Sequence, residues 1–250
     1  LGLDTYGSRS LSVGGVAVAS ACDKVVEKAK LMAAHSMEAS ADDMEFNGGV
    51  FSVAGSPDKA MAIQEVAFGA FTAHDLPDGM EPNLQEQTTW DPPNFAFPFG
   101  SHVAVVEIDE DTGNVELLNY VAVDDCGIQV NPMIVEGQVH GGIAQGVGQA
   151  LWEGANYDED GNCTNPSFMD YLVPSSMEMP NFTLDFTVTP STSNPLGVKG
   201  VGEAGTIGSA AAVINAVCDA LSPHGITDIA MPATPQRVWR AINDAKGGAA

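Results

Sequence analysis

The pattern of apolar and polar positions predicts five helices. Apolar residues recur at helical spacing, or follow helix start signals, in residues 16–39, 56–71, 132–152, 207–221 and 235–242. Ser12 is the expected N-cap of the first helix, and Ser56 followed by Pro57 is expected to start the second. Thr206 is a candidate cap for the fourth.

Alternation of apolar and polar residues predicts two β-hairpins and two further strands. Residues 46–53 form the first hairpin, with a turn at Asn47-Gly48. In the second hairpin, residues 102–108 pair with residues 115–123 across the turn DEDTGN. The two further strands are residues 182–188 and 228–231.

Helices and strands in mixed order, together with hairpins, favour an α+β fold over a doubly wound parallel sheet. We expect layered α/β sandwich subdomains with mixed sheets. Residues 74–99 are rich in Pro, Asp and Asn and show little periodicity, so we expect the chain to cross between subdomains there. The predicted domains are residues 1–95 and residues 96–250.

The charge of the chain narrows its possible partners. Its 250 residues include 33 Asp and Glu but only 9 Lys and Arg, which gives a net charge of −24. Nucleic acid is excluded as a partner, because phosphate binding needs clustered Lys and Arg. An acid-rich, lysine-poor surface fits high salt, which screens self-repulsion, so we hypothesise a halophilic source. An anionic ligand must be bound by local donors against this field.

The remaining composition is that of a globular protein, because 44% of the residues are hydrophobic and can form a core. No uninterrupted apolar run approaches the roughly 18 residues of a membrane span, and no secretory signal is visible. The four cysteines form no CxxC pair, which favours reduced thiols and a cytoplasmic location. The histidines show no metal-ligand spacing, so no protein-ligated metal is predicted. The chain opens on LGLDTYGSRS without Met, and we expect it to be part of a longer protein.

The segment NPLGVKGVGEAGTIG, residues 194–208, places one carboxylate, Glu203, among glycines directly before a helix. Glycine lets the backbone approach another group closely, and a helix N-terminus offers unpaired N–H groups. Glu203 is therefore a candidate general base. The structural alternative is a surface acid stabilised by the helix dipole. Lys199 is a candidate partner of Glu203 or a candidate anion ligand.

The same segment also contains the pattern GxGxxG of dinucleotide-binding loops, at Gly200, Gly202 and Gly205. That pattern is informative only between a strand and a helix, whereas turn-forming residues precede it here. A carboxylate at position 203 would also face the pyrophosphate with like charge. Binding of a dinucleotide such as NAD is therefore a minor alternative.

Two further segments have the character of a ligand site. The helix from Pro132 has five interior glycines, whose propensity cost sums to roughly 3–5 kcal/mol. These glycines either allow close packing of the helix or let a ligand approach, with Gln138 and Gln145 supplying amide hydrogen bonds. The loop TYGSRS contains Arg9 and precedes a helix, which suits anion binding, and an ordinary capped turn is the alternative.

Six stretches of the chain resemble the molybdenum hydroxylase family, which includes xanthine dehydrogenase, aldehyde oxidase and aerobic carbon monoxide dehydrogenase. They are SHVAVVEIDEDTG, YVAVDDCG, VNPMIVEGQVHGGIAQGVGQALWE, FMDYLVP, NPLGVKGVGEAGTIG and MPATPQRVWRAI. The resemblance spans nearly the whole chain and is to the C-terminal part of the large, molybdenum-binding subunit. It is closest in style to the carbon monoxide dehydrogenase-like branch, which TYGSRS also resembles.

This resemblance implies a molybdopterin cofactor, in its cytosine dinucleotide form, whose dithiolene holds molybdenum without protein ligands. It implies that Glu203 is the general base and that Gln138 and Gly202 bind the cofactor. The segment implied to contact the dinucleotide consists of Gly7, Ser8, Arg9 and Ser10. Electrons are implied to leave through iron–sulfur clusters and FAD on partner subunits or domains.

The function expected from the resemblance is oxidation of a small substrate at a molybdopterin centre. The family's N-terminal domain and the first half of its cofactor domain are absent from this sequence, so we expect the isolated chain to be inactive. The substrate stays open among carbon monoxide, an aldehyde, a purine and another heterocycle. The alternative function is a non-catalytic molybdopterin-binding or assembly module.

Overall fold

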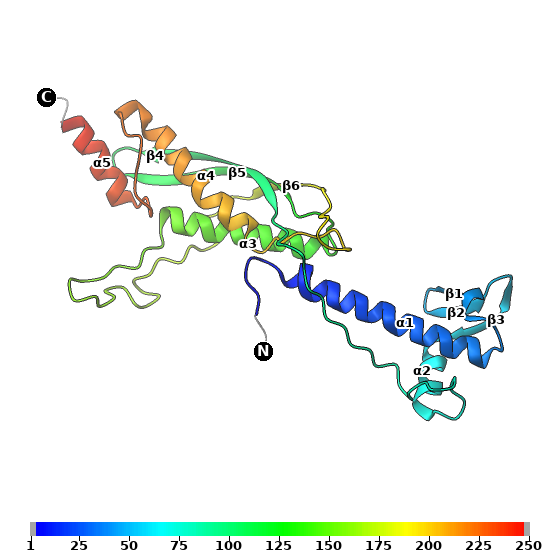
Figure 1. The fold of residues 1–250 in the computed structure, drawn as a ribbon. Helices are drawn as coiled ribbons and strands as arrows, with labels where there is room; N and C mark the ends of the chain where they lie inside the picture. Colours follow the sequence, from blue (N-terminus) through cyan, green and yellow to red (C-terminus); the bar gives the residue numbers. More distant parts are fainter. Residues whose placement is uncertain (1–3, 248–250) are drawn as a thin grey trace. The chain divides into compact units, whose positions relative to one another are not determined.

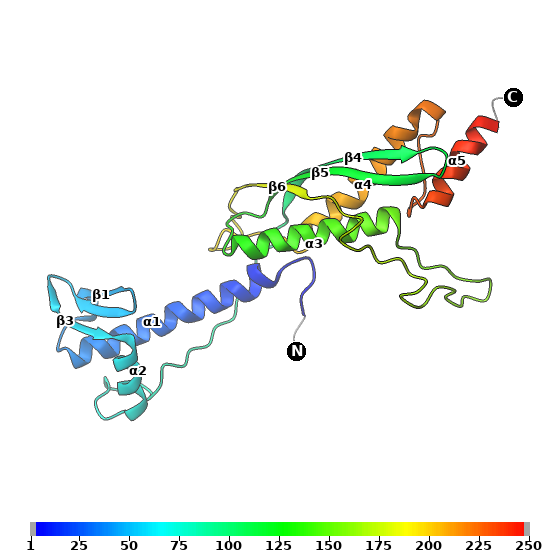
Figure 2. The ribbon, with the colours of Figure 1, turned by 180° about the vertical axis from the view of Figure 1, so that it is seen from behind.

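The computed structural model describes residues 4–247 and divides them into two units (Figures 1 and 2). One unit consists of residues 13–91, and the other joins residues 4–12 to residues 92–247. The division after Asp91 lies close to the expected boundary at residue 95. Residues 4–12, however, belong with the C-terminal unit and not with the domain that the sequence assigned to them. The reason is a pair of hydrogen bonds between Ser8 and Glu203.

The smaller unit packs two helices on a small antiparallel sheet. Its elements are the π-helix Leu11–Gly15, α1 (Val16–Ser36), the 3₁₀ helix Ala41–Asp43, β1 (Met44–Asn47), β2 (Val50–Val53), β3 (Ser56–Ala62) and α2 (Ile63–Thr72). The sheet order is β1-β2-β3, and the first pair is the expected hairpin. Met32 of α1, Phe51 of β2 and Val66 of α2 are buried in one core.

Two predicted helix starts in the first third of the chain are wrong. The helix expected from Ser56 begins only at Ile63, because Ser56–Ala62 pairs with β2 as a third strand. The carboxylate of Glu65 then accepts a hydrogen bond from the Ala62 amide at 3.0 Å, which caps the new helix start. Ser12 is not an N-cap, since it lies within the π-helix and its hydroxyl donates to the Arg9 carbonyl.

The larger unit has a mixed sheet covered by helices on one face (Figure 1). Its elements are β4 (Phe99–Asp109), β5 (Asn114–Asp125), α3 (Pro132–Leu151), β6 (Phe182–Thr187), α4 (Ala204–Leu221), the 3₁₀ helix Ser222–His224 and α5 (Pro235–Gly247). Strands β4 and β5 are antiparallel, whereas β5 and β6 are parallel. The expected α+β class with mixed sheets and hairpins is confirmed.

The strand expected at residues 228–231 is not formed. Ile229 is buried in the core, which accounts for the apolar pattern. The guanidinium of Arg237 donates to the carbonyl oxygens of Ala230 and Pro232 at 2.9 and 2.8 Å. The Ala230 carbonyl is therefore satisfied by a side chain rather than by a neighbouring strand.

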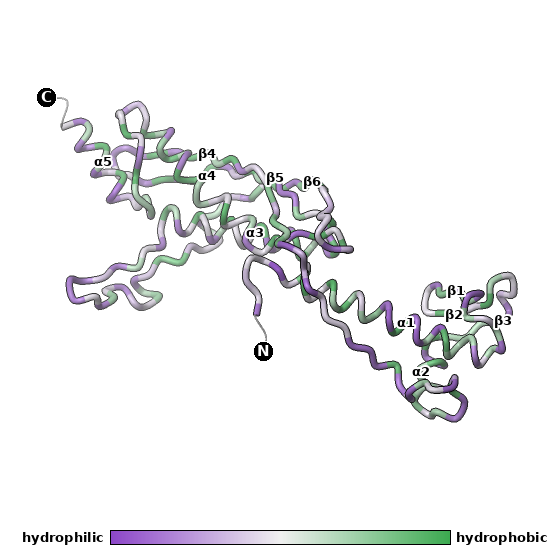
Figure 3. Tube along the Cα trace, viewed as in Figure 1, coloured by the Kyte–Doolittle hydropathy of each residue, from purple (hydrophilic) through white to green (hydrophobic). Residues whose placement is uncertain are grey.

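The core of the larger unit lies between β5 and the helices. Tyr120 of β5, Ile143 of α3 and Val213 of α4 are each fully buried in it. Figure 3 shows hydrophobic residues concentrated along these helices and strands, and hydrophilic ones along the connection from α2 to β4. The stretch Ala204–His224 is long and apolar enough to cross a membrane by length and composition alone. Its residues Val213, Val217 and Leu221 are buried against the rest of this core, as in the core helix of a globular unit.

Helices α3 and α4 touch through their backbones. A Cβ atom at Gly205 would lie 2.5 Å from the Val139 carbonyl oxygen, and one at Gly142 would lie 2.9 Å from the Thr206 amide nitrogen. A Cβ at Gly146 would overlap the Ser209 hydroxyl. Only glycine permits this separation, which brings the first turn of α4 against the middle of α3.

A buried ion pair anchors the loop before α4 to the end of β5. Lys199 Nζ lies 3.0 Å from Asp125 Oδ1, and the two side chains are 9% and 0% exposed. The Gly127 amide and the Thr187 hydroxyl also donate to this carboxylate. Burial alone would raise the pKa of Asp125, but the hydrogen bonds from Lys199 and Gly127 outweigh it and lower the pKa. Lys199 therefore pairs with Asp125 rather than with Glu203.

Replacing Gly142 tests the backbone contact between α3 and α4. Gly142→Ala should destabilise the chain by about 1–3 kcal/mol, because the new methyl group overlaps backbone atoms that cannot rotate away. Gly137→Ala, in the same helix but facing open space, should stabilise it by up to about 1 kcal/mol through helix propensity. Urea unfolding of both variants measures the difference, and equal stabilities would contradict the close contact.

Removing the lysine tests the buried ion pair. Lys199→Met should cost about 3–5 kcal/mol near neutral pH, because it leaves the Asp125 carboxylate buried without its cation. In the wild type the lowered pKa of Asp125 contributes stability that is present above its ordinary pKa and is lost on acidification. In the variant, burial raises that pKa, so protonation relieves the strain and the deficit should shrink as the pH falls.

The control for this experiment is Lys246→Met, which removes the exposed Lys246–Glu110 pair and should change stability little at any pH. Thermal melts of the three proteins from pH about 7 to about 4 provide the comparison. A deficit for Lys199→Met that is small, or that grows toward acid pH, would show that the pair does not neutralise a buried charge.

Candidate functional site

Glu203 is the N-cap residue of α4, with φ −109° and ψ −5°, and its side chain is exposed. The helix thus begins three residues earlier than a cap at Thr206 predicts. The hydroxyl of Ser8 donates to Glu203 Oε2 at 2.9 Å and accepts from the Glu203 amide at 3.0 Å. Within the described chain, no hydrogen bond to Oε1 is formed, so this oxygen is available to a substrate or a proton.

The loop that carries Ser8 packs against the glycines of the Glu203 segment. Gly7 and Ser8 both have left-handed backbones, with φ +58° and +57°. A Cβ at Gly200 would lie 2.7 Å from the Ser8 Cβ and 2.9 Å from its carbonyl oxygen. Gly200 and Gly202 therefore lie at a contact between two loops, and Gly205 lies at the contact of α4 with α3. The GxGxxG pattern thus reflects packing rather than a strand–turn–helix nucleotide site.

Gln138 of α3 reaches the same place. A Cβ at Gly202 would lie 3.4 Å from both Gln138 Oε1 and Ser8 Oγ, so these side chains border Gly202 from two sides. The structure thus brings together Ser8, Gln138, Gly202 and Glu203. They come from the N-terminal loop, from α3 and from the start of α4.

The glycines of α3 divide into two groups, and both explanations offered for them apply. Gly142 and Gly146 face α4 at backbone distance. A Cβ at Gly137 or Gly141 would meet nothing within 4 Å. These two glycines lie on the exposed face that also carries Gln138, so they leave an open surface beside Glu203.

Arg9 and Ser10 make local contacts. The Arg9 guanidinium lies 3.9 Å over the Tyr6 ring and donates to the Asp4 carbonyl oxygen at 2.9 Å. The Ser10 hydroxyl lies 2.5 Å from that of Thr5. Neither residue contacts Glu203 through a hydrogen bond that the structure shows, although both belong to the same loop as Ser8. Gln145 is exposed on α3, two turns beyond Gln138.

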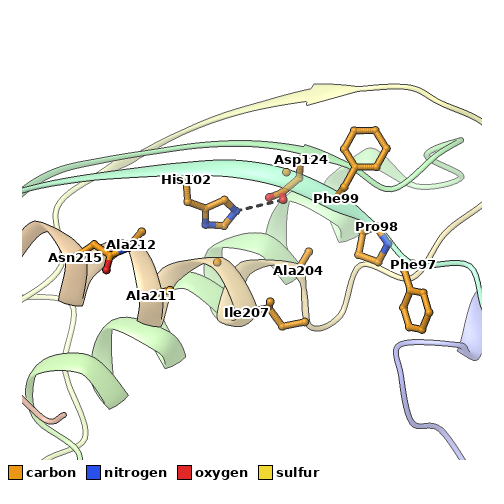
Figure 4. Close-up of a pocket in the computed structure, with 12 residues that line it drawn as sticks. Phe97, Pro98, Phe99, His102, Asp124, Ala204, Ile207, Ala211, Ala212 and Asn215 are labelled. Atoms are coloured by element: carbon orange, nitrogen blue, oxygen red, sulfur yellow. Dashed lines mark hydrogen bonds and ion pairs between the residues drawn. The ribbon is translucent and has the colours of Figure 1, made fainter. Parts of the chain in front are cut away.

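A cavity of about 360 Å³ lies between β4 and α4, adjoining Ala204 (Figure 4). His102 and Asp124 point toward each other from the sheet, with Nε2 and Oδ1 3.2 Å apart. The other ring nitrogen, Nδ1, lies 2.7 Å from the Tyr120 hydroxyl. Because a carboxylate oxygen accepts, Nε2 is the donor in the contact with Asp124.

This buried chain of polar groups was missed by the sequence analysis. Burial, and then the charge of Asp124, raises the pKa of Tyr120, so its hydroxyl stays protonated as the donor. His102 and Asp124 lie on paired strands of known register, but nothing in their spacing marks them as neighbours. The register of β4 against β5 brings the two side chains together, and Gly208 of α4 leaves room for the His102 ring.

The site contains the Glu203 carboxylate, of which Oε2 accepts a hydrogen bond from Ser8 and Oε1 accepts none from the described residues. The start of α4 adds the partial positive charge of the helix dipole beside it. An amide side chain and the open glycine face of α3 border the same point. Among residues 4–247, no group of three or more His, Cys, Asp or Glu side chains is arranged to hold a metal ion. The arrangement therefore suits proton transfer beside a bound organic group.

Comparison with known proteins identifies the family. Residues 1–180 match the family model of the molybdopterin cofactor-binding domain. The chain is 41% identical over 243 residues to the carbon monoxide dehydrogenase large chain of Hydrogenophaga pseudoflava, covering 97% of this chain and 30% of that one. It is 40% identical over 241 residues to the nicotine 6-hydroxylase large subunit of Paenarthrobacter nicotinovorans, with coverage of 96% and 30%.

Solved structures of related enzymes have the same fold as this chain. Reconstituted CO dehydrogenase from Oligotropha carboxidovorans superposes with a TM-score of 0.90 at 39% identity, over 99% of this chain and 30% of that one. Quinoline 2-oxidoreductase from Pseudomonas putida 86 gives a TM-score of 0.86 at 39% identity, over 97% and 31%. The chain spans about 30% of the length of the curated relatives it matches. It belongs to the molybdenum hydroxylase family and corresponds to the molybdopterin-binding region of the large subunit.

Proposed function

We propose that this chain forms part of a molybdenum-dependent oxidoreductase in which Glu203 is the general base. The observation that supports the proposal most directly is the convergence of Ser8, Gln138 and Glu203 around Gly202. Three segments far apart in sequence contribute to one place, and the carboxylate there keeps one oxygen open. A surface acid that merely stabilises a helix would not need partners from two other segments.

The residues present fit a molybdopterin cytosine dinucleotide. Gly137 and Gly141 leave the face of α3 open, so a flat organic group can lie against the helix without meeting side chains. The Gln138 amide supplies hydrogen bonds, and the loop containing Gly7, Ser8, Arg9 and Ser10 supplies backbone N–H groups and a guanidinium for phosphate. Gly202 has no side chain, so the cofactor can come close to the backbone at this position. The cofactor itself, when bound, supplies the redox chemistry of molybdenum through its dithiolene, without protein ligands.

Glu203 acts by accepting a proton as the substrate is oxidised. Its Oε2 is occupied by the Ser8 hydroxyl, so Oε1 is the accepting atom. The carboxylate lies at the N-terminus of α4, where the partial positive charge of the helix dipole favours an anion. General bases of this kind contribute about 10²–10⁴-fold to a rate.

The proposal extends to partners and setting. An oxidised substrate releases electrons, and we propose that iron–sulfur clusters and FAD on partner subunits or domains accept them. The remaining part of the large subunit is also required, since the chain corresponds to 30% of its relatives' length. A cytoplasmic location is proposed from the unpaired cysteines, and a high-salt habitat from the net charge of −24.

The alternative is a non-catalytic module that binds or helps to assemble the cofactor. It is supported by the match of residues 1–180 to the molybdopterin cofactor-binding domain, which requires binding of the cofactor but no turnover. The relatives' names give the substrate panel that separates the two functions: carbon monoxide, nicotine, quinoline and xanthine. Oxidation of one of them by the assembled enzyme, with a dye as electron acceptor, supports catalysis. Retention of cofactor with no oxidation of any of them supports the module.

Glu203→Gln in the assembled enzyme tests the base directly. Turnover should fall by about 10²–10⁴-fold, because the amide cannot accept the proton, while molybdenum content stays near that of the wild type. Metal analysis and steady-state rates on the same preparations measure both quantities. The matched control is Glu107→Gln, which alters an exposed acid on β4 and should leave both unchanged. Full turnover in Glu203→Gln would remove Glu203 from the mechanism.

A further inference from the structure

The Ser8 hydroxyl and Glu203 form a reciprocal pair across 195 residues of sequence. Ser8 Oγ donates its proton to Glu203 Oε2 at 2.9 Å and accepts the Glu203 amide proton at 3.0 Å. An N-cap side chain normally supplies such an acceptor from the helix's own sequence. Here Glu203 itself is the N-cap residue and makes no such bond, so a serine from another segment supplies the acceptor.

The backbone around Ser8 is built for this contact. A non-glycine residue at φ +57° is uncommon and is found where the surroundings enforce it. Gly200 lets the two loops pack closely enough to hold this conformation, because any side chain there would overlap the Ser8 Cβ and carbonyl oxygen. The Gly200 amide in turn donates to the Ala96 carbonyl oxygen at 3.0 Å, which holds the Gly200 backbone in place against Ser8. The left-handed backbone thus points the hydroxyl at Glu203.

This geometry uses the only proton of the Ser8 hydroxyl. A serine has one O–H donor and two acceptor lone pairs, and the carboxylate takes the donor. The side chain therefore has no proton left to donate to an anionic cofactor. The role expected for Ser8 from the family resemblance, contact with the dinucleotide, can be filled by its backbone but not by hydroxyl donation.

We propose that Ser8 is a positioning residue, whose hydroxyl holds one oxygen of Glu203 so that Oε1 faces the substrate. The catalytic consequence rests on the proposed function, whereas the structural claim stands on the two hydrogen bonds alone. A glutamate side chain has three rotatable bonds, and an exposed one samples several rotamers. The hydrogen bond from Ser8 restricts these rotamers before substrate arrives, which matters for turnover rather than for substrate affinity.

The first arm of the test is kinetic and uses the assembled enzyme with the panel substrate that gives the highest rate. Ser8→Ala keeps the backbone preference of serine and removes the hydroxyl. We expect kcat to fall about 10- to 100-fold, the range for losing a hydrogen bond to a charged group, with KM changed by less than about twofold. Molybdenum and cytosine nucleotide content should equal those of the wild type.

Two further variants separate positioning from folding. Ser8→Gly relieves the left-handed backbone and so should fold at least as well as wild type, yet it should lose as much kcat as Ser8→Ala. Ser8→Asn tolerates the same backbone and offers an amide N–H to the carboxylate, so it should recover part of the rate. Ser101→Ala, an exposed serine on β4, is the matched control and should match the wild type.

The second arm needs no substrate. Crystal structures of the assembled wild type and Ser8→Ala should show a single Glu203 rotamer in the first and more than one in the second. A single unchanged rotamer in Ser8→Ala would overturn the proposal. So would loss of cofactor in proportion to loss of activity, or an unchanged kcat in Ser8→Ala while Glu203→Gln is inactive. If Glu203→Gln instead stays active, the general base is wrong, and the rotamer comparison alone decides the positioning claim.

Discussion

The arrangement of the larger unit depends on the backbone contact between α3 and α4. Gly205 and Gly142 let the first turn of α4 lie against the middle of α3, at distances that no side chain permits. This contact sets where Glu203 is, because Glu203 is the residue directly before α4. It also sets where Gln138 is relative to that carboxylate, since Gln138 is one turn before Gly142. A larger residue at either glycine would separate the two functional side chains as well as the two helices.

Two polar interactions, together with the contact between α3 and α4, hold the segment before α4 in place. The buried pair of Lys199 and Asp125 ties the segment before Glu203 to the end of β5. The Ser8 hydroxyl ties Glu203 itself to the N-terminal loop. Both partners of the first pair are nearly excluded from water, so the pair has little tolerance for loss of one member. The second pair is partly exposed and can adjust. The loop is thus anchored at two points, one buried at Lys199 and one exposed at Glu203.

Features that local sequence patterns determine were predicted, whereas features that tertiary contacts determine were missed. The α+β class, both hairpins and the helix from Pro132 come from periodicity and turn residues, and the structure forms them. The helix expected at Ser56 failed because Ser-Pro also suits a strand start, and pairing with β2 decided the outcome. Glycines next to Glu203 and within α3 marked the site region, but their partners could not be assigned. Contacts such as His102 with Asp124 depend on the register of two strands, which no local signal specifies.

The net charge of −24 limits how this site can attract an anionic cofactor. The lysine within the Glu203 segment cannot help, because Asp125 neutralises it. Long-range attraction is therefore unavailable, and binding must come from short-range donors: the Gln138 side chain and the loop that contains Arg9. The backbone N–H groups of this loop also suit the task, since they add no charge that the acidic surface could neutralise. Salt that screens the acidic surface should weaken these contacts little, because they act at hydrogen-bonding distance. The acidic surface thus repels an anionic cofactor at long range. It does little to weaken the hydrogen bonds that hold the cofactor once it is bound.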